Sequence, residues 1–196
     1  ENSMSRYFYP VLFFLAFLSG SDSYCLTPGG KSGSDQDTVN DIQTLYNGII
    51  WTNLYYRIRE DQFLFSRDLL PGSVSIGGKT FRNLKVRYDI YNDQIMIPND
   101  KGLILQLNKE TTDSFTLDFN GTVYRFENFR KDTTEVLQGY LNVLHKGRCS
   151  LYVKYRKEIE LLAVDKKFDK FYQLHRIYAV MDDKIHPIKS AGDFYK

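Results

Sequence analysis

Pairs of turn-forming residues recur along this chain, and on either side of each pair apolar and polar side chains alternate. The clearest pair is Asn120-Gly121, which favours a type I′ turn because both residues tolerate a positive φ. A hairpin that turns there brings five apolar residues to one face of a sheet: Phe115, Leu117, Phe119, Tyr124 and Phe126. A chain with such turns folds mainly as antiparallel β-sheet.

Four further pairs each predict a hairpin in a definite register. The predicted partners are Val74 with Phe81 across Gly77-Gly78, Ile90 with Ile95 and Tyr88 with Ile97 across Asn92-Asp93, Leu144 with Cys149 and Tyr140 with Val153 across Lys146-Gly147, and Ala179 with His186 across Asp182-Asp183. A longer loop at 99–102 precedes a strand at 103–107. With segments 49–58 and 62–65 added, we expect about ten to twelve strands, a meander of hairpins forming a sandwich or a partly closed barrel.

One or two short helices accompany these strands. In residues 37–46, Val39, Ile42 and Leu45 recur at helical spacing behind Asp37, a residue suited to cap a helix. A second helix is predicted over residues 158–171. Because no helix-length amphipathic segments separate the strands, a parallel βαβ architecture is not expected.

The stretch around Asn92-Asp93 also contains two aspartates, Asp89 and Asp93, which raise the possibility of a metal or proton-transfer site. The predicted register places Asp89 beside Arg87 on the face opposite the apolar residues, and it makes Asp93 a turn residue with a positive φ. The two carboxylates are then not expected to converge. No metal site and no cofactor are predicted.

The first residues resemble a secretory signal peptide. Met4 and Arg6 precede an apolar run over residues 9–18, about half the length of a membrane-spanning helix. Small residues follow, so we predict a signal peptide at 1–23, a flexible Gly- and Ser-rich leader at 24–36 and a single β-rich domain at 37–196. We therefore expect an exported protein, in the periplasm, on the outer-membrane surface or outside the cell, with no transmembrane span when mature.

Loss of residues 1–23 removes Arg6, Glu1 and Asp22 and changes the net charge from +2 to +3. This weak charge indicates no polyanionic partner, so we expect no nucleic-acid binding.

The chain contains two cysteines, Cys25 and Cys149. In an oxidising compartment they are candidates for a disulfide, which would stabilise the fold by about 4–5 kcal/mol because the closed loop is long. Two unrelated thiols are the alternative. Acylation of Cys25 as in a lipoprotein is a further alternative, although Tyr24 is bulky for the position before such a cysteine.

Several motifs resemble functional sites without satisfying them. Gly72–Thr80 is similar to a phosphate-binding loop, but Ser73 stands where its first glycine is needed, and Lys79-Thr80 leads into a predicted strand. His145, His175 and His186 are expected on strands rather than together. The basic run 154–157 precedes Glu158 and Glu160, which is typical of a solvated charged face.

Aromatic residues are abundant, with 15 Tyr, 14 Phe and 1 Trp. Four of them lie within a short stretch: Tyr46, Trp51, Tyr55 and Tyr56. Exposed aromatic side chains of this kind hold sugars or peptides. The alternative interpretation is that these rings belong to the core or to cross-strand pairs, because β-strands favour aromatic residues.

Five segments resemble a group of uncharacterised exported β-rich proteins of Bacteroidota: Asn47–Trp51, Asp61–Phe65, Gly72–Lys79, Val86–Asp93 and Gly139–Gly147. The resemblance covers turn and strand positions over residues 45–188. It implies the envelope of a Gram-negative cell, and it brings no catalytic residues with it.

Taken together, these features predict a non-catalytic secreted or envelope protein that acts as a binding or scaffolding module for an envelope protein or a glycan. Two alternatives stay open: a small β-barrel that carries an apolar ligand, and an enzyme whose active site is assembled from distant residues. An outer-membrane barrel is less consistent with the chain, because its strands need about 9–11 residues.

Overall fold

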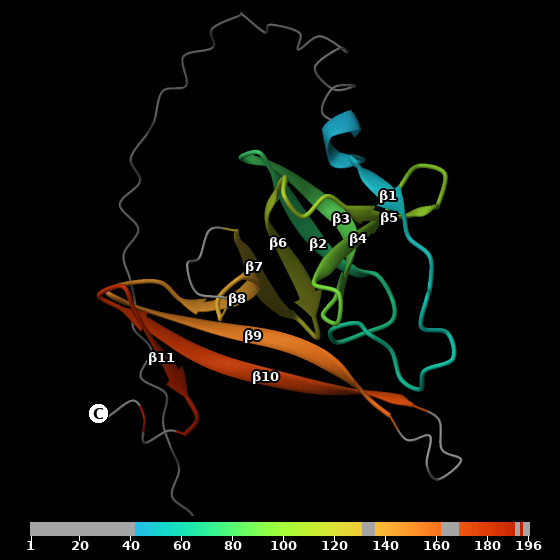
Figure 1. Ribbon diagram of the computed structural model, residues 1–196. Helices are drawn as coiled ribbons and strands as arrows, with labels where there is room; N and C mark the ends of the chain where they lie inside the picture. The colour runs from blue at the N-terminus through green and yellow to red at the C-terminus, as the bar shows by residue number, and fades with distance from the viewer. Residues whose placement is uncertain (1–41, 131–135, 162–168, 191–192, 194–196) are drawn as a thin grey trace, which may run out of the picture. The chain divides into compact units, whose positions relative to one another are not determined.

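The computed structural model describes residues 42–130, 136–161, 169–190 and 193, which belong to one compact unit. These residues form one antiparallel sheet of eleven strands in the order β1-β5-β4-β3-β2-β6-β7-β8-β9-β10-β11 (Figure 1). The strands are β1 Gly48–Ile50, β2 Leu70–Ile76, β3 Lys79–Asp89, β4 Gln94–Pro98, β5 Ile104–Leu107, β6 Thr112–Phe119, β7 Thr122–Phe129, β8 Gly139–His145, β9 Cys149–Glu160, β10 Lys170–Met181 and β11 Lys184–Ile188. The mainly β, antiparallel fold class is therefore confirmed.

Two meanders make up this sheet. The first runs from β2 to β5 and the second from β6 to β11, and they join where β6 pairs with β2. The chain passes from one meander to the other at residues 108–111. Asn108 organises this crossover: its Oδ1 accepts a hydrogen bond from the Glu110 N–H at 2.9 Å, and its carbonyl accepts one from the Thr112 hydroxyl at 2.8 Å.

Three of the predicted hairpin registers are confirmed. Val74 pairs with Phe81, Phe115 with Phe126, and Ala179 with His186. Both residues at each of the three turns, 77–78, 120–121 and 182–183, have a positive φ. The type I′ turn predicted at Asn120-Gly121 is consistent with these values, and the turns at 77–78 and 182–183 share this property.

Two other registers were wrong by two residues. Tyr88 pairs with Ile95 rather than Ile97, because residues 90–93 form a longer loop between β3 and β4. Asn142 pairs with Val153 in place of Tyr140, and a bulge follows in β8. Since a shift of two residues keeps side chains on their face, the apolar face predicted for β3 and β4 survives.

The helix predictions agree less well with the structure than the hairpin predictions do. Residues 42–45 form one helical turn, and the rest of the segment 37–46 before them lies outside the described residues. The helix predicted at 158–171 is wrong at both of its ends, because Glu158 and Ile159 continue β9 and pair with Tyr172 and Phe171 of β10. Its middle, residues 162–168, lies outside the described residues. Segments 51–58 and 62–65 are not strands either; apart from isolated bridges they form an irregular connection between β1 and β2.

A large core joins the described turn and connection to the strands β2–β8. It contains Leu45, Leu64, Val74, Ile76, Val86, Tyr88, Ile90, Ile95, Ile97, Leu107, Phe115, Leu117, Phe126 and Tyr140. The rings of Phe115 and Phe126 stack with centroids 4.6 Å apart, and the Tyr88 ring meets both edge-on. Aromatic pairs of this geometry add about 0.5–1.5 kcal/mol each to the effect of burial.

The sheet coils around this core but does not close. Tyr88 of β3 contacts Tyr140 of β8 with ring centroids 5.8 Å apart, although β2, β6 and β7 lie between those strands in the sheet. No strand pairing joins β1 to β11 in the described sheet. Of the two predicted architectures, the molecule is therefore nearer to a partly closed barrel than to a sandwich, and aromatic side chains fill its concave side.

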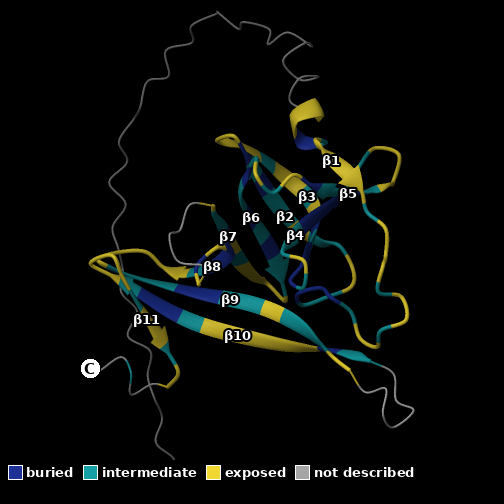
Figure 2. Cartoon of the chain, viewed as in Figure 1, coloured by how far each residue is buried: buried dark blue, intermediate teal, exposed yellow. Residues whose placement is uncertain are grey.

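We call the last three strands, β9–β11, the ribbon. A second, small core is formed between the ribbon and β8 with the residues before it. It consists of Leu137, Leu141, Tyr152 and Tyr178. Much of the ribbon is not covered: residues 172–176 of β10 are exposed in succession, so both faces of the strand meet solvent there (Figure 2).

Residues 1–41 lie outside the described part of the chain, so the predicted signal peptide, leader and domain start remain predictions, as does the Cys25–Cys149 disulfide. Cys149 is half-buried at the start of β9. Within the described residues, no helix is long and apolar enough to cross a membrane.

Candidate functional site

The connection between β1 and β2 is irregular but firmly held. Its backbone exchanges hydrogen bonds with three separate strands. The N–H groups of Trp51 and Leu64 donate to the carbonyls of Ile104 and Tyr88, both at 2.9 Å. The Arg59 carbonyl accepts a hydrogen bond from the Phe171 N–H at 3.1 Å. A buried backbone needs such partners. The connection therefore has a defined shape although it is not part of a regular ladder.

Lys157 of β9 binds the same connection through hydrogen bonds and an ion pair. Its ammonium group donates to the carbonyls of Asp61 at 2.6 Å and Phe63 at 2.8 Å, and it pairs with the Asp61 carboxylate at 3.2 Å. Only 13% of the Lys157 side chain is exposed. The prediction that run 154–157 is a solvated face was therefore wrong for this lysine, which joins β9 to residues 61–63.

A hollow of about 190 Å³ opens on this connection; we call it the aromatic hollow. Its lining residues are Trp51, Asn53, Tyr55, Tyr56, Ile58, Glu60, Asp61, Gln62, Phe63, Arg67 and Arg87. Three of the four aromatic residues predicted to bind a ligand thus come together in one place.

Arg87 reaches this hollow from β3. Its guanidinium carbon lies 4.8 Å from the Trp51 ring centroid and 4.1 Å from that of Phe63, close enough for cation–π attraction to both rings. Burial lowers the pKa of Arg87, against the raising effect of Asp89 and other nearby carboxylates. Its buried Nε has no hydrogen-bond partner among the described residues.

Tyr55 and Tyr56 differ in how far their rings are held by neighbouring side chains. The Tyr55 ring meets Tyr91 and Phe171 edge-on at 5.0 and 5.7 Å, and its hydroxyl donates to Asn92 Oδ1 at 3.2 Å. Burial raises the pKa of Tyr55. Tyr56 is 69% exposed, and among the described residues only the neighbouring Arg57 lies over its ring. Tyr55 thus has a fixed position, whereas Tyr56 offers a ring to solvent.

Tyr46, the fourth predicted binding residue, does not line this hollow. It packs against the large core from the end of the helical turn. Burial and the nearby carboxylate of Asp100 raise its pKa. For Tyr46 the structure favours the alternative interpretation, a ring that serves the core.

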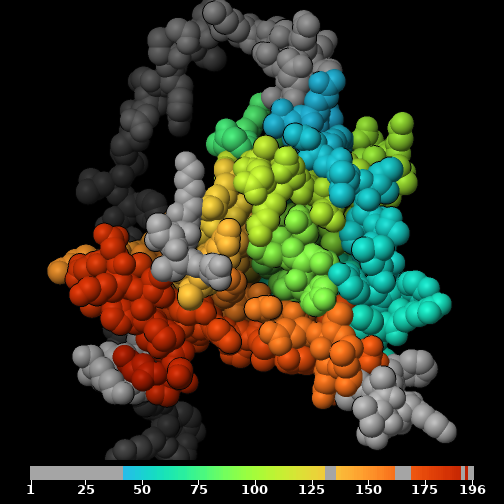
Figure 3. All heavy atoms as spheres, viewed as in Figure 1, coloured from blue at the N-terminus to red at the C-terminus, as the bar shows by residue number. Residues whose placement is uncertain are grey.

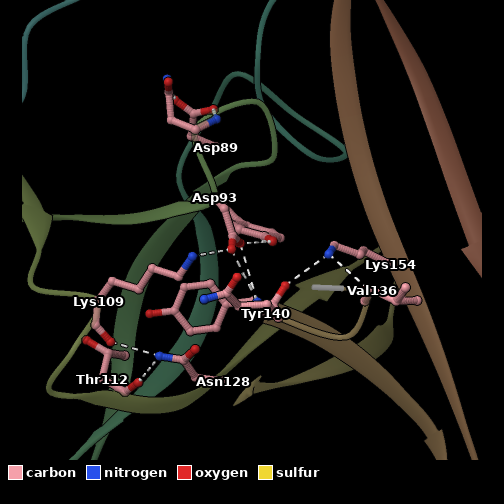
Figure 4. A network of polar contacts seen from close by, with 11 residues as sticks. Asp89, Asp93, Lys109, Thr112, Asn128, Val136, Tyr140 and Lys154 are labelled. Carbon is pink, nitrogen blue, oxygen red and sulfur yellow. Dashed lines mark hydrogen bonds and ion pairs between the residues drawn. The ribbon is translucent and has the colours of Figure 1, made fainter. Parts of the chain in front are cut away.

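Asp89 and Asp93 do not share a site (Figure 4). Asp89 is buried and caps the β3–β4 loop: it accepts hydrogen bonds from the N–H groups of Tyr91 and Asn92, both at 2.9 Å, and from the Asn92 amide at 2.8 Å. Burial raises the pKa of Asp89, against the lowering effect of these bonds. The described residues contain no group of three His, Cys, Asp or Glu that could hold a metal ion.

Asp93 has the positive φ predicted for it and fixes the sheet at one end. Its carboxylate accepts a hydrogen bond from the Tyr88 hydroxyl at 2.6 Å, pairs with Lys109 of the crossover and faces the Tyr140 N–H at 3.4 Å. Asn128 of β7 holds the same crossover through the Lys109 carbonyl at 2.8 Å. This network connects both meanders and is structural.

The predicted P-loop likeness is also explained by structure, because Lys79 and Thr80 begin β3. The three histidines lie exposed on separate strands or turns of β8, β10 and β11. Arg87 and Phe63 were not predicted as parts of the hollow, since they are distant from Trp51 in sequence. The only available signal was alternation in β3, which turns Arg87 away from its buried neighbours Val86 and Tyr88.

Comparison with known proteins found no matching family model, no similar curated protein and no similar solved structure.

Proposed function

We propose that this protein is a non-catalytic, exported binding module that holds a neutral glycan in the aromatic hollow. The observation that carries the proposal is the convergence of Trp51, Tyr55 and Tyr56 on one hollow that also contains amide and charged side chains. Aromatic faces pack against the apolar faces of sugar rings, and the surrounding polar groups exchange hydrogen bonds with sugar hydroxyls.

The charges of the hollow favour a neutral ligand. Glu60 and Asp61 oppose Arg67 and Arg87, and the Arg67 Nε lies 4.0 Å from the Asp61 carboxylate. A ligand with a strong charge of either sign would meet repulsion from one of these pairs. A hydroxyl-rich ligand can use both, because hydroxyls donate and accept.

The hydrogen bonds made by the carboxylates of Asp89 and Asp93 support a non-catalytic role. Asp89 is occupied as a loop cap and Asp93 as a link between strands. A general acid or base must reach a substrate proton. These two groups serve the fold instead.

The test is titration of the purified protein with neutral oligosaccharides, first on a glycan array and then by calorimetry. We expect Tyr56→Ala to weaken binding at least tenfold with unchanged folding, since Tyr56 is 69% exposed. Tyr172→Ala, which removes an exposed tyrosine of β10, is the matched control and should leave binding unchanged. Equal binding by wild type and Tyr56→Ala, or turnover of a glycan that one point mutation abolishes, would overturn the proposal.

Export and the likeness to the Bacteroidota group are separate parts of the proposal. They rest on the apolar run at residues 9–18 and on the segments named above. N-terminal sequencing of the protein from an envelope fraction should find a mature chain that begins near Asp22 or Tyr24. Recovery from the cytoplasm with Met4 retained would contradict this part.

A further inference from the structure

Two adjoining hollows lie on the ribbon, away from the aromatic hollow. One has a volume of about 860 Å³ and the other about 240 Å³, and both are lined by Val136, His175, Arg176 and Tyr178. Because they share these residues, we treat them as one groove, the ribbon groove. Its larger section falls within the range of about 300–1,000 Å³ that small-molecule sites occupy.

The larger section is mainly apolar. Its described lining includes Ile177 and Tyr178 of β10 and Ile185, Pro187 and Ile188 of β11. The atoms of β10 and β11, drawn in red in Figure 3, reach the surface of that view. This surface suits a hydrocarbon chain, which gains about 0.8 kcal/mol for each methylene group that it buries.

The smaller section is cationic. Lys154, Arg156 and Arg176 line it, with Glu158 as the one carboxylate among the described lining residues. Arg156 lies 3.6 Å from Glu158. Lys154 donates its ammonium hydrogens to the carbonyls of Val136 at 3.0 Å and Gln138 at 2.9 Å, and no ion pair joins it to a carboxylate among the described residues.

Arg176 and Lys154 are direct partners in the β9–β10 ladder. Like charges directly opposite each other destabilise a sheet. No ion pair joins Arg176 to a carboxylate in the part of the chain that the structure describes. An anion placed between the two side chains would remove this repulsion, and an apolar groove begins at the same position.

We propose that the ribbon groove binds a long-chain carboxylate of the fatty-acid class. The hydrocarbon chain lies along Tyr178, Ile185 and Pro187. The ladder register places these side chains on the same face as Arg176 and Lys154, which hold the carboxylate. The concave side of the sheet does not offer such a site, because the rings of Tyr88, Phe115 and Phe126 fill it. This site is independent of the glycan proposed for the aromatic hollow.

The test is titration with oleate, below the concentration at which it aggregates, followed by calorimetry and by displacement of a fluorescent fatty acid. We expect saturable binding, weakened at least tenfold by Arg176→Glu and by Pro187→Asp, a substitution at an exposed lining residue on the same face. Lys85→Glu, an exposed site on β3 with the same change in charge, is the matched control and should bind as wild type does. Circular dichroism checks that each variant keeps its sheet.

Three outcomes would overturn the proposal. They are absence of saturable oleate binding, equal binding of oleate and its uncharged methyl ester, and binding to vesicles of anionic phospholipid without binding of free oleate. Tyr56→Ala should bind oleate as wild type does. Failure of glycan binding and failure of oleate binding are therefore separate results.

Discussion

The β3–β4 hairpin and the ribbon contain the same structural unit, paired antiparallel strands, but they use their residues in opposite ways. Ile95, Met96 and Ile97 are buried in succession in β4, whereas residues 172–176 are exposed in succession in β10 (Figure 2). Strand β4 is covered on both faces, and the middle of β10 is covered on neither. Backbone pairing alone therefore does not determine where the stability of this sheet lies.

The two regions differ in whether their polar side chains hold the fold together or are free to bind a ligand. Around the large core, polar residues such as Asp89 and Asp93 are bound to other parts of the fold. In the ribbon, Arg176 has no ion pair among the described residues and lies beside a groove. Stability is expected to depend mainly on the first region, and binding of an amphiphile on the second.

The largest contrast is expected from truncating one side chain in each region. Phe126→Ala should lower the free energy of unfolding by about 3–5 kcal/mol, because the buried ring stacks on Phe115 and leaves a cavity. Leu174→Ala, at a β10 position 37% exposed, should cost below about 1 kcal/mol. Urea denaturation measures both, and similar losses would break the comparison.

The next effect concerns two glycines with a positive φ. Gly139 has φ +98°, and a Cβ there would collide with the Asp93 carboxylate, whereas Gly102 has φ +76° and open space around it. Gly102→Ala should cost about 1 kcal/mol through backbone strain alone. Gly139→Ala should cost about 2–3 kcal/mol, since it also displaces the link between the β3–β4 loop and β8. Thermal melting of both variants is the measurement, and equal losses would show that Asp93 is not structural.

A smaller loss is expected from removing the buried lysine. Lys157→Met should cost about 2 kcal/mol, because the carbonyls of Asp61 and Phe63 lose a charged donor. Lys170→Met, whose ion pair with Glu160 is 45% and 46% exposed, should cost at most about 1 kcal/mol. Lys157→Met should also weaken ligand binding in the aromatic hollow. A stable variant with unchanged binding would remove Lys157 from this account.

The smallest expected effect is on the pH dependence of the free energy of unfolding. Burial raises the pKa of Asp89, so the folded chain binds more protons than the unfolded chain between the ordinary and the raised pKa. Stability should therefore fall as pH rises through that interval. Asp89→Asn should flatten this slope while its side-chain oxygen still caps the loop. Denaturation curves across mildly acidic pH give the test, and an unchanged slope would contradict it.

Local turn chemistry made much of the fold predictable. Asn120-Gly121 and Gly77-Gly78 gave correct registers because each turn is closed by its own two residues. Asn92-Asp93 failed because Asp89 captures the N–H groups of Tyr91 and Asn92 and so lengthens the loop. This side-chain bond is not visible in the spacing of apolar residues.

The failed helix and the incomplete site have a tertiary cause. Residues 158–160 and 170–171 form strands because each segment pairs with the other, with Ile159 beside Phe171. Such pairing overrides local propensity. Nearness in sequence was enough to bring Trp51, Tyr55 and Tyr56 to one hollow. Arg87 could not be assigned to it, because its position depends on how the connection folds back over β3.

Hydrogen–deuterium exchange of the whole chain, read by mass spectrometry, tests the division between core and ribbon most directly. We expect that amides of residues 86–89, 94–97 and 115–118 exchange only with global unfolding, and that residues 172–176 exchange at least about a hundredfold faster through local opening. Equal protection of β4 and the middle of β10 would contradict it, because the two regions would then share one source of stability.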